Sequence, residues 1–347
     1  MFKGIDFYSD TVTKPTGPML RAMVEAEVGD EQMGEDPTTL ALEKKTAELL
    51  GLSAALFLPS STMANQIALQ LHCARGEELL AAENCHLFFA EAGGPAIHAG
   101  VMVRPIPTPT GIFTADQVRK TFRHKIGPHY PVSKLLSIEN TTNMGGGLAW
   151  SKEELDSVLD VANELGLKTH LDGSRLFNAV VKMELSPKEI ASRFDTVTVC
   201  LSKGLGCAMG ALLGFDKKHY VTVRRLKQLM GGSLRQSGIL AAAGLYAFEN
   251  HIHRIKEDHA NATFFAQELE SIKHLSVEKN PHGTNMVFFH WVSSGISDRD
   301  FLRLCIEQGV RFSHVDHNRF RAVTHLNLSR SDIEKAMKTV RGICNEI

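Results

Sequence analysis

A lysine directly after a buried strand is the residue of this sequence best placed for covalent chemistry. Residues 196–201 are β-branched or apolar, a pattern that predicts a buried strand. Lys203 follows, and glycines at 204, 206 and 210 allow a tight turn and the close approach of another group. A lysine amine that is poorly hydrated can form a Schiff base with a carbonyl compound. Most lysines after strands are ordinary surface residues, so this interpretation depends on what surrounds Lys203.

Three other polar segments stand where predicted strands end. Residues 59–62 (Pro-Ser-Ser-Thr) join a strand to a helix, where free backbone N–H groups favour an anion such as phosphate; simple helix capping would use the same residues. Asp172 follows a short apolar strand, and its carboxylate could cap a helix, pair with Arg175 or hold a cofactor cation. Residues 139–143 form a polar loop before three glycines. Ligands of parallel sheets collect at the carboxyl ends of strands, so we expect these segments to face one site.

Pyridoxal 5'-phosphate (PLP) needs three contacts of these kinds. Lys203 would supply the amine, and Asp172 would supply the anion that keeps the pyridine nitrogen protonated. Ser61 and Thr62 would bind the phosphate. The order along the chain, phosphate loop, then aspartate, then lysine, suits a PLP enzyme.

The whole chain from about residue 7 resembles one family of PLP enzymes. The resemblance is carried, in order, by residues 9–13, 28–30, 34–38, 91–94, 136–141, 170–180, 200–206, 235–244 and 323–325. On these residues the chain is similar to the low-specificity L-threonine aldolases of the beta-eliminating lyase/threonine aldolase family. The resemblance implies the PLP-dependent transferase fold (fold type I). It also implies retro-aldol cleavage of L-threonine or L-allo-threonine to glycine and an aldehyde, through a Schiff base on Lys203.

The resemblance also implies a role for each matching residue. His86 would stack on the cofactor ring, and Arg235 would reach the phosphate of a neighbouring subunit. The substrate carboxylate would be held by Ser9, Arg175 and Arg321, with Arg175 also near a cofactor oxygen.

A second histidine, His129, would lie near the substrate hydroxyl. The base is either His86 or a water held by the two histidines, and the sequence leaves this choice open. The chain departs from the family pattern at Tyr8, Met33 and Ser61, among other positions.

The whole-chain pattern predicts an α/β fold. Short apolar runs alternate with helical periods from residue 54 to 215, which indicates a mainly parallel sheet between helices. We expect a large PLP-binding domain over residues 1–240 and a smaller α+β domain over residues 241–347. A long helix is predicted over residues 235–269 and a strand over residues 323–328. The apolar run 238–248 and the expected role of Arg235 imply a homodimer at least, and the family is usually tetrameric.

Composition excludes several classes of protein. The 347 residues carry a formal net charge of −1 with no basic stripe, so neither nucleic acid nor a membrane surface is an expected partner. The six cysteines are scattered without a Cys-x-x-Cys pair, which suits a reducing compartment and excludes a cysteine-bounded zinc module. The N-terminus lacks a signal-peptide pattern, and no apolar run reaches the roughly 20 residues of a membrane span. We expect a cytoplasmic protein with an amino-acid substrate and no metal.

Three alternatives stay open. Another PLP reaction on the same fold, amino-acid racemisation or β-elimination, would also use Lys203 and Asp172. A catalytically silent PLP-fold protein is kept open by the departures at Tyr8 and Met33, although the presence of Lys203 and Asp172 argues against it. A dinucleotide oxidoreductase is suggested by the glycines at 204, 206 and 210, but that fingerprint belongs early in a βαβ unit with an acidic residue about 20 positions later.

Overall fold

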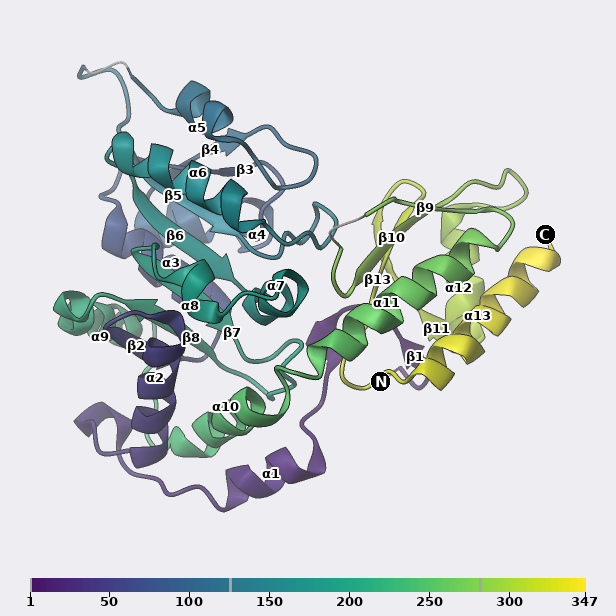
Figure 1. Cartoon of the computed structure of the whole chain (residues 1–347), viewed down its shortest axis with the longest axis horizontal. Coiled ribbons are helices and arrows are strands. Elements are labelled where there is room, and N and C mark those ends of the chain that lie inside the picture. The colour runs from purple at the N-terminus through teal and green to yellow at the C-terminus, as the bar shows by residue number, and fades with distance from the viewer. Residues whose placement is uncertain (1, 125–126, 281–282) are drawn as a thin grey trace.

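The computed structural model describes residues 2–124, 127–280 and 283–347, which form two lobes (Figure 1). The larger lobe is built on a seven-stranded sheet with the order β2-β8-β7-β6-β5-β3-β4. Only β8 runs antiparallel to its neighbours, so the prediction of a mainly parallel sheet is confirmed. The strands are β2 (Ala54–Leu58), β3 (Glu78–Ala82), β4 (Met102–Ile106), β5 (Ser133–Glu139), β6 (Lys168–Gly173), β7 (Thr196–Cys200) and β8 (Ala211–Phe215).

Helices cover both faces of this sheet. On one face α3 packs with α9 against Leu56, Leu58 and Phe215, and on the other α2, α6 and α8 lie in a row. The helices of this lobe are α1 (Gly17–Val24), α2 (Pro37–Leu50), α3 (Ser61–His72), α4 (His86–Phe89), α5 (Ala115–Thr121), α6 (Lys152–Glu164), α7 (Leu176–Met183), α8 (Pro187–Ala191), α9 (Tyr220–Leu229) and α10 (Gly238–Asn250). Short turns η1 (Asp10–Val12), η2 (Glu31–Met33), η3 (Pro95–Ala99) and η4 (Lys217–His219) connect them.

The smaller lobe has a four-stranded antiparallel sheet in the order β12-β13-β10-β9. Its strands are β9 (Leu275–Val277), β10 (Met286–Trp291), β12 (Ser313–Asp316) and β13 (Arg319–Val323). Its helices are α11 (Ile255–Glu270), α12 (Asp298–Glu307) and α13 (Arg330–Asn345). Aromatic rings in mutual contact, among them Phe265, Phe289 and Phe320, fill the core between this sheet and the helices.

Both chain ends lie in the smaller lobe (Figure 1). There β1 (Ile5–Asp6) pairs in parallel with β11 (Val310–Arg311), and Phe7 enters the aromatic core. In the other direction α10, which begins just before the expected boundary at residue 240, packs on α1 and α2 of the larger lobe. The first residues of the chain thus belong to the smaller lobe, and α10 belongs to the larger one. The division into domains 1–240 and 241–347 stays a prediction.

The single helix predicted over residues 235–269 is wrong. The structure has α10 and α11 with a turn over residues 251–254 between them. Here the ring of His251 turns inward, and its Nδ1 lies 2.7 Å from the carbonyl oxygen of Leu205. This tertiary contact interrupts a stretch whose local pattern is helical throughout.

The strand predicted over residues 323–328 is also mostly wrong. β13 ends at Val323, where the backbone N–H of Val323 donates to Phe7 and that of Thr324 donates to Asn285. The segment after it is a turn, so only its first residue belongs to the strand.

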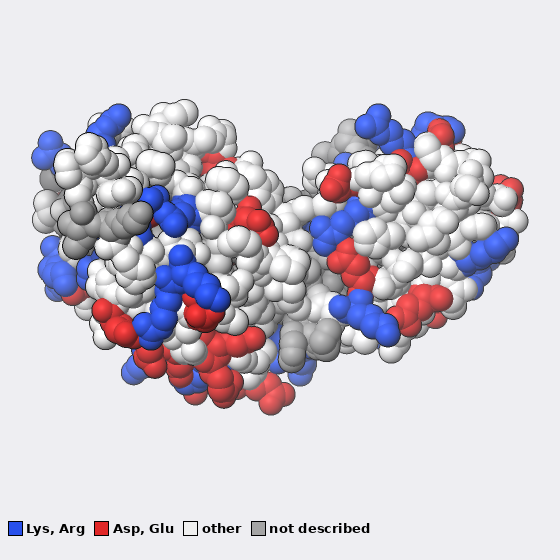
Figure 2. Space-filling view, turned by 90° about the horizontal axis from the view of Figure 1, so that it is seen from above, with Lys and Arg blue, Asp and Glu red and all other residues white. Residues whose placement is uncertain are grey.

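The surface carries charges of both signs on both lobes, and a notch separates the lobes on the face seen from above (Figure 2). Within the described residues, no helix combines the length and the apolar character that crossing a membrane requires.

Candidate active site

The carboxyl edge of the large sheet gathers most of the predicted side chains. Glu139 and Asp172 are neighbours at the ends of the parallel strands β5 and β6. β2 runs parallel to β7 because both are antiparallel to β8, so the chain leaves β2 and β7 at this same edge. The start of α3, Asp172 and Lys203 therefore belong to one edge, toward which the arrowhead of β6 points in Figure 1.

Asp172 is a buried carboxylate held by donors. Its Oδ2 accepts from Nδ2 of Asn65 at 2.9 Å, and its Oδ1 accepts from both the hydroxyl (2.6 Å) and the backbone N–H of Ser174. Burial acts to raise the pKa of Asp172, but the charge of Lys203 and the Ser174 hydrogen bond outweigh it, and the pKa is lowered. A permanent anion at this position suits a partner that carries a proton on a ring nitrogen.

Lys203 is half-buried in the loop after β7. Its backbone carbonyl accepts from the hydroxyl of Thr13 at 2.9 Å and from the backbone N–H of Gly206 at 2.9 Å. Two interactions from different parts of the chain thus define the path of this loop. The charge of Lys203 lowers the pKa of Asp172 and of Asp10, so the three groups share one electrostatic neighbourhood.

The first turn of α3 fits a phosphate. Ser60 caps the helix by accepting from the backbone N–H of Met63, while the hydroxyl of Ser61 is buried without a hydrogen-bond partner. Thr62 is exposed beside it, and a cavity of about 610 Å³ next to this turn is lined by Ser60, Thr62, Gln66 and Glu91, among others. An orphaned donor at a helix N-terminus is what a bound phosphate would satisfy. With Asp172 and Lys203 at the same edge, these residues fit PLP.

His86 starts α4 beside Asp172. Its Nδ1 lies 3.0 Å from Oε1 of Glu91, and its backbone N–H donates to Glu139 at 3.1 Å. The hydrogen bond to Glu91 raises the pKa of His86 above its ordinary value. Because Nδ1 faces a carboxylate, it carries the hydrogen, and Nε2 is left to accept a proton.

Glu139 is a second buried carboxylate at this edge. Its other oxygen accepts from the backbone N–H of Asn143 at 2.8 Å. Burial, followed by the charge of Asp172, raises its pKa to about 7. It anchors the start of α4 and the loop after β5 to each other.

Arg175 is already paired with an acid that the sequence analysis did not single out. Its Nε and Nη2 donate to the two carboxylate oxygens of Asp10 at 2.7 and 2.6 Å, and both side chains are buried. Burial acts to raise the pKa of Asp10, but Arg175 holds it well below its usual range. Ser9 lies next to this pair, with its hydroxyl 3.4 Å from Oδ1 of Asp10.

Arg321, on β13 of the smaller lobe, has no acidic partner among the described residues. Its Nη1 donates to Oδ1 of Asn143 at 2.6 Å and Nη2 to the carbonyl of Tyr8 at 3.4 Å, while Nε is buried without a partner. Burial, with the charge of Arg175, lowers its pKa to about 10. A buried guanidinium with an unused donor is a binding site for a carboxylate.

Two predicted site residues lie elsewhere in this single chain. Arg235 is exposed and pairs with Asp30 at 2.8 Å. His129 is exposed in the loop between α5 and β5, which leads to the amino end of β5, the end opposite Glu139. Neither side chain joins Lys203 within one chain.

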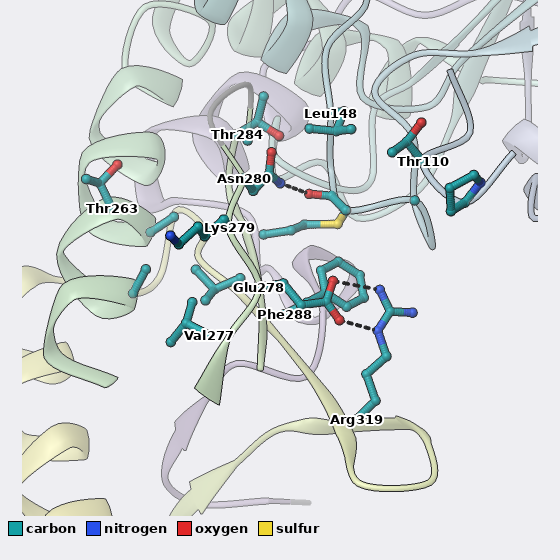
Figure 3. Close-up of a pocket in the computed structure, with 18 of the residues that line it drawn as sticks. Thr110, Leu148, Thr263, Val277, Glu278, Lys279, Asn280, Thr284, Phe288 and Arg319 are labelled. Carbon is teal, nitrogen blue, oxygen red and sulfur yellow. Dashed lines mark hydrogen bonds and ion pairs between the residues drawn. The ribbon is translucent and has the colours of Figure 1, made fainter. Parts of the chain in front are cut away.

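A separate cavity of about 1070 Å³ lies between the lobes (Figure 3). It is lined by Thr110 and Leu148 from the larger lobe and by Phe288 and Arg319 from the smaller one. Arg319 lies over the ring of Phe288, 4.4 Å from its centroid, and pairs with Glu278 at 2.6 Å. None of the predicted cofactor-binding residues lines this cavity, although Phe288 pairs with Arg321 across the strands.

Comparison with known proteins agrees with this geometry. Residues 6–292 match the family described as beta-eliminating lyase. The low specificity L-threonine aldolase of Escherichia coli K12 is 39% identical over 334 residues, which cover 95% of this chain and 96% of the relative. The structure of Leishmania major threonine aldolase is 20% identical, with a TM-score of 0.85 over 98% of this chain and 99% of that one. A structure of SPT with PLP has a TM-score of 0.77 at 13% identity, over 99% of this chain and 88% of that one.

The solved structures show that the chain has fold type I, as the sequence predicted, and the family match makes it a PLP-dependent enzyme. Within that class the chain belongs to the beta-eliminating lyase family and to its low-specificity threonine aldolases. The cofactor prediction is confirmed by the family, and the chain is a lyase.

Proposed function

We propose that this enzyme cleaves L-threonine, L-allo-threonine and related β-hydroxy-α-amino acids to glycine and an aldehyde. The observation that carries this proposal is His86, whose Nδ1 is held by Glu91 so that Nε2 is left to take up a proton at the edge where Asp172 lies. Retro-aldol cleavage needs such a base for the β-hydroxyl proton. The relatives of this chain that are named L-threonine aldolases support the same reaction.

Each residue then has one task. Arg321 binds the substrate carboxylate with its unused Nε, Asp172 keeps a proton on the ring nitrogen of the cofactor, and Ser61 and Thr62 hold the phosphate. When bound, PLP takes up the electron pair that the breaking Cα–Cβ bond releases. His86 accepts the hydroxyl proton as the carbonyl of the leaving aldehyde forms.

Two tasks close the cycle. Lys203 would attach the cofactor and release the product, and the proton that His86 took from the hydroxyl would be passed on to Cα, which completes glycine. Arg175, paired with Asp10, keeps one guanidinium nitrogen, Nη1, for a cofactor oxygen or the substrate carboxylate, and Ser9 lies next to it. His129 would act near the hydroxyl only from a loop of another subunit, so His86 is the better-supported base.

Racemisation and β-elimination are the competing reactions, because both would use Lys203 and Asp172. Neither needs a base at the β-hydroxyl, so the Glu91–His86 pair favours the aldolase.

We also propose a homodimer or homotetramer that works in the cytoplasm. Apolar side chains are exposed on α1 (Leu20, Val24), η2 (Met33), α4 (Phe88, Phe89), η3 (Ile97) and α10 (Ile239). A second copy of the chain that covers these side chains would remove them from water. Arg235 would reach the phosphate of the neighbouring subunit from this side. The six cysteines are all buried and free, which suits a reducing compartment.

The test is acetaldehyde release from L-threonine and L-allo-threonine by purified enzyme with PLP, beside a Lys203→Ala control. Acetaldehyde that disappears in the control supports the proposal. A protein that binds PLP but releases no acetaldehyde would refute it and point to racemisation or elimination, which chiral amino-acid analysis and ammonia release distinguish.

A further inference from the structure

Asn65 connects the acids of the site. It lies in α3, one turn after Ser61, and is 1% exposed. Its Nδ2 donates to Oε1 of Glu91 at 2.8 Å and to Oδ2 of Asp172 at 2.9 Å, while its Oδ1 lies 3.1 Å from Nε2 of His170. An amide nitrogen has two hydrogens, so both are used on the two carboxylates.

The direction of these hydrogen bonds is determined by their partners. Two ionised carboxylates can only accept, so the amide nitrogen of Asn65 faces them and its oxygen faces His170. Nε2 of His170 must then carry a hydrogen. Burial lowers the pKa of His170 to about 4, so the ring is neutral and its Nδ1 accepts from the hydroxyl of Thr196 at 2.9 Å.

His72 completes the chain at the far end. Its Nε2 lies 3.1 Å from the hydroxyl oxygen of Thr196, which accepts because its hydrogen is given to His170. Burial lowers the pKa of His72 to about 3. Every donor from His72 to Asn65 therefore points toward the carboxylates, along a path of buried or half-buried side chains.

The acids need this support because of their surroundings. A ring nitrogen of His86 and one carboxylate oxygen each of Glu91 and Asp172 lie within 4.8 Å of one another. Asp172 also faces Glu139 on β5, Lys203 after β7 and His170 on its own strand. Without the two hydrogens of Asn65, neighbouring carboxylates would repel and share a proton.

We propose that Asn65 is a positioning residue, oriented by His170, that holds the carboxylates of Asp172 and Glu91 with one hydrogen bond each, so that Asp172 faces the cofactor ring nitrogen and Glu91 holds the His86 base. This inference rests on the proposed function for the role of His86. The part of the inference that concerns Asp172 does not depend on the reaction and rests on the geometry of the cofactor site alone.

The test compares holoenzyme variants by the absorbance of bound PLP as a function of pH, and by the pH profile of kcat. Asn65→Leu replaces the amide with a side chain of similar size that has no hydrogen-bond donor. The absorbance change on the acidic side, where Asp172 takes up a proton, should then move to higher pH by about one unit, because hydrogen bonds to an ionised group stabilise its charged form. Asn65→Asp moves it further, because one more carboxylate joins Asp172, Glu91 and Glu139. We expect kcat to fall about 10- to 100-fold, the effect typical of residues that orient the side chains in direct contact with a bound group.

Two controls separate positioning from general stability. Asn261→Leu removes an amide of α11 that donates to Leu328, and it should leave the absorbance titration and kcat unchanged. The second control changes the partner of the Asn65 oxygen. His170→Gln keeps a donor near the position of Nε2, so the absorbance of its bound PLP should change with pH as in the parent enzyme. His170→Phe removes that donor, so its absorbance change should move to higher pH as in Asn65→Leu.

An unchanged titration in Asn65→Leu, or an equal shift in Asn261→Leu, overturns the proposal. If Asn65→Leu yields no folded holoenzyme, equal titrations of the two His170 variants overturn it. If the parent enzyme cleaves no β-hydroxy amino acid, the proposed function fails, but the absorbance titration still tests Asn65 because it requires no turnover.

Discussion

The two arginines near Lys203 differ in what compensates their charge. Arg175 is neutralised by Asp10 through two short hydrogen bonds, whereas Arg321 donates, among the residues that the structure describes, to the neutral oxygens of Asn143 and Tyr8. A buried cation without a counterion is costly, and a bound carboxylate removes that cost. We therefore propose that the substrate carboxylate binds mainly to Arg321 and that Arg175, with only Nη1 left unpaired within the described part of the chain, is the secondary contact.

Replacing Arg321 with lysine tests this assignment. A lysine keeps the charge but cannot form the forked contact with a carboxylate, so KM for L-threonine should rise about 10- to 100-fold, the value of one charge-assisted hydrogen bond. Steady-state kinetics measure it. Arg319→Lys, two residues along the same strand, is the matched control and should leave KM near the parent value. Equal effects in both variants would contradict the assignment.

The sequence could identify those site residues whose place at a strand end or a helix start is evident from the adjacent residues. Lys203 follows β7, Asp172 lies near the end of β6, and Ser61 opens α3, so each could be placed at the sheet edge from local pattern alone. Asn65 and Asp10 could not be assigned roles in this way. Their partners lie 107 and 165 residues away in the chain, and only the folded structure brings them together.

At the scale of elements, a buried ionic cluster joins α2, β2, η2 and α9. Nζ of Lys227 contacts Oε1 of Glu31 at 2.5 Å, and Glu43 accepts from the backbone N–H of Phe57 at 2.9 Å. Burial raises the pKa of Glu43 to about 7, even though Lys227 lies nearby. The cluster holds η2, which carries Met33, against the larger lobe.

Glu43 makes the free energy of unfolding decrease as pH rises from about 4.5 through 7. A carboxyl whose pKa is about 7 when folded and 4.5 when unfolded contributes fully below pH 4.5 and loses its contribution as pH rises through 7. Glu43→Gln stays neutral and can still accept from Phe57. Relative to the parent, it should gain about 2–3 kcal/mol between pH 4.5 and pH 8. Unfolding at the two pH values measures this, with the exposed Glu48→Gln on the same helix as control. A gain independent of pH would refute it.

Elements with clear boundary signals were predicted closely. α2 runs from Pro37 to Leu50 with Asp36 accepting at its N-terminus and Gly51 in the left-handed region after it, as the sequence indicates. The boundary between α10 and α11 carries no such signal. The contact of His251 with Leu205 ends the helix there, and no local pattern encodes a partner 46 residues away.

At the scale of the whole molecule, the site of one chain lacks two of its predicted members. Arg235 is exposed and pairs with Asp30, His129 is exposed in the loop before β5, and the exposed apolar side chains of α1, α4 and α10 lie on the same larger lobe as the site. A second copy that covers these side chains would bury them and bring its own Arg235 toward the phosphate. An enzyme assembled in this way divides each site between two chains.

Mixed oligomers test that division. Lys203→Ala and Arg235→Ala should each be nearly inactive alone. If Lys203 acts in its own chain and Arg235 in the neighbour's site, a mixed dimer regains one intact site, since one site collects both substitutions and the other collects none. Random assembly of equal amounts then restores about a quarter of the parent activity, because half of the dimers are mixed and each has one working site. Co-expression with two different affinity tags isolates the mixed species for the acetaldehyde assay. Mixed dimers as inactive as either variant would place Arg235 in the site of its own chain, since no intact site would then form.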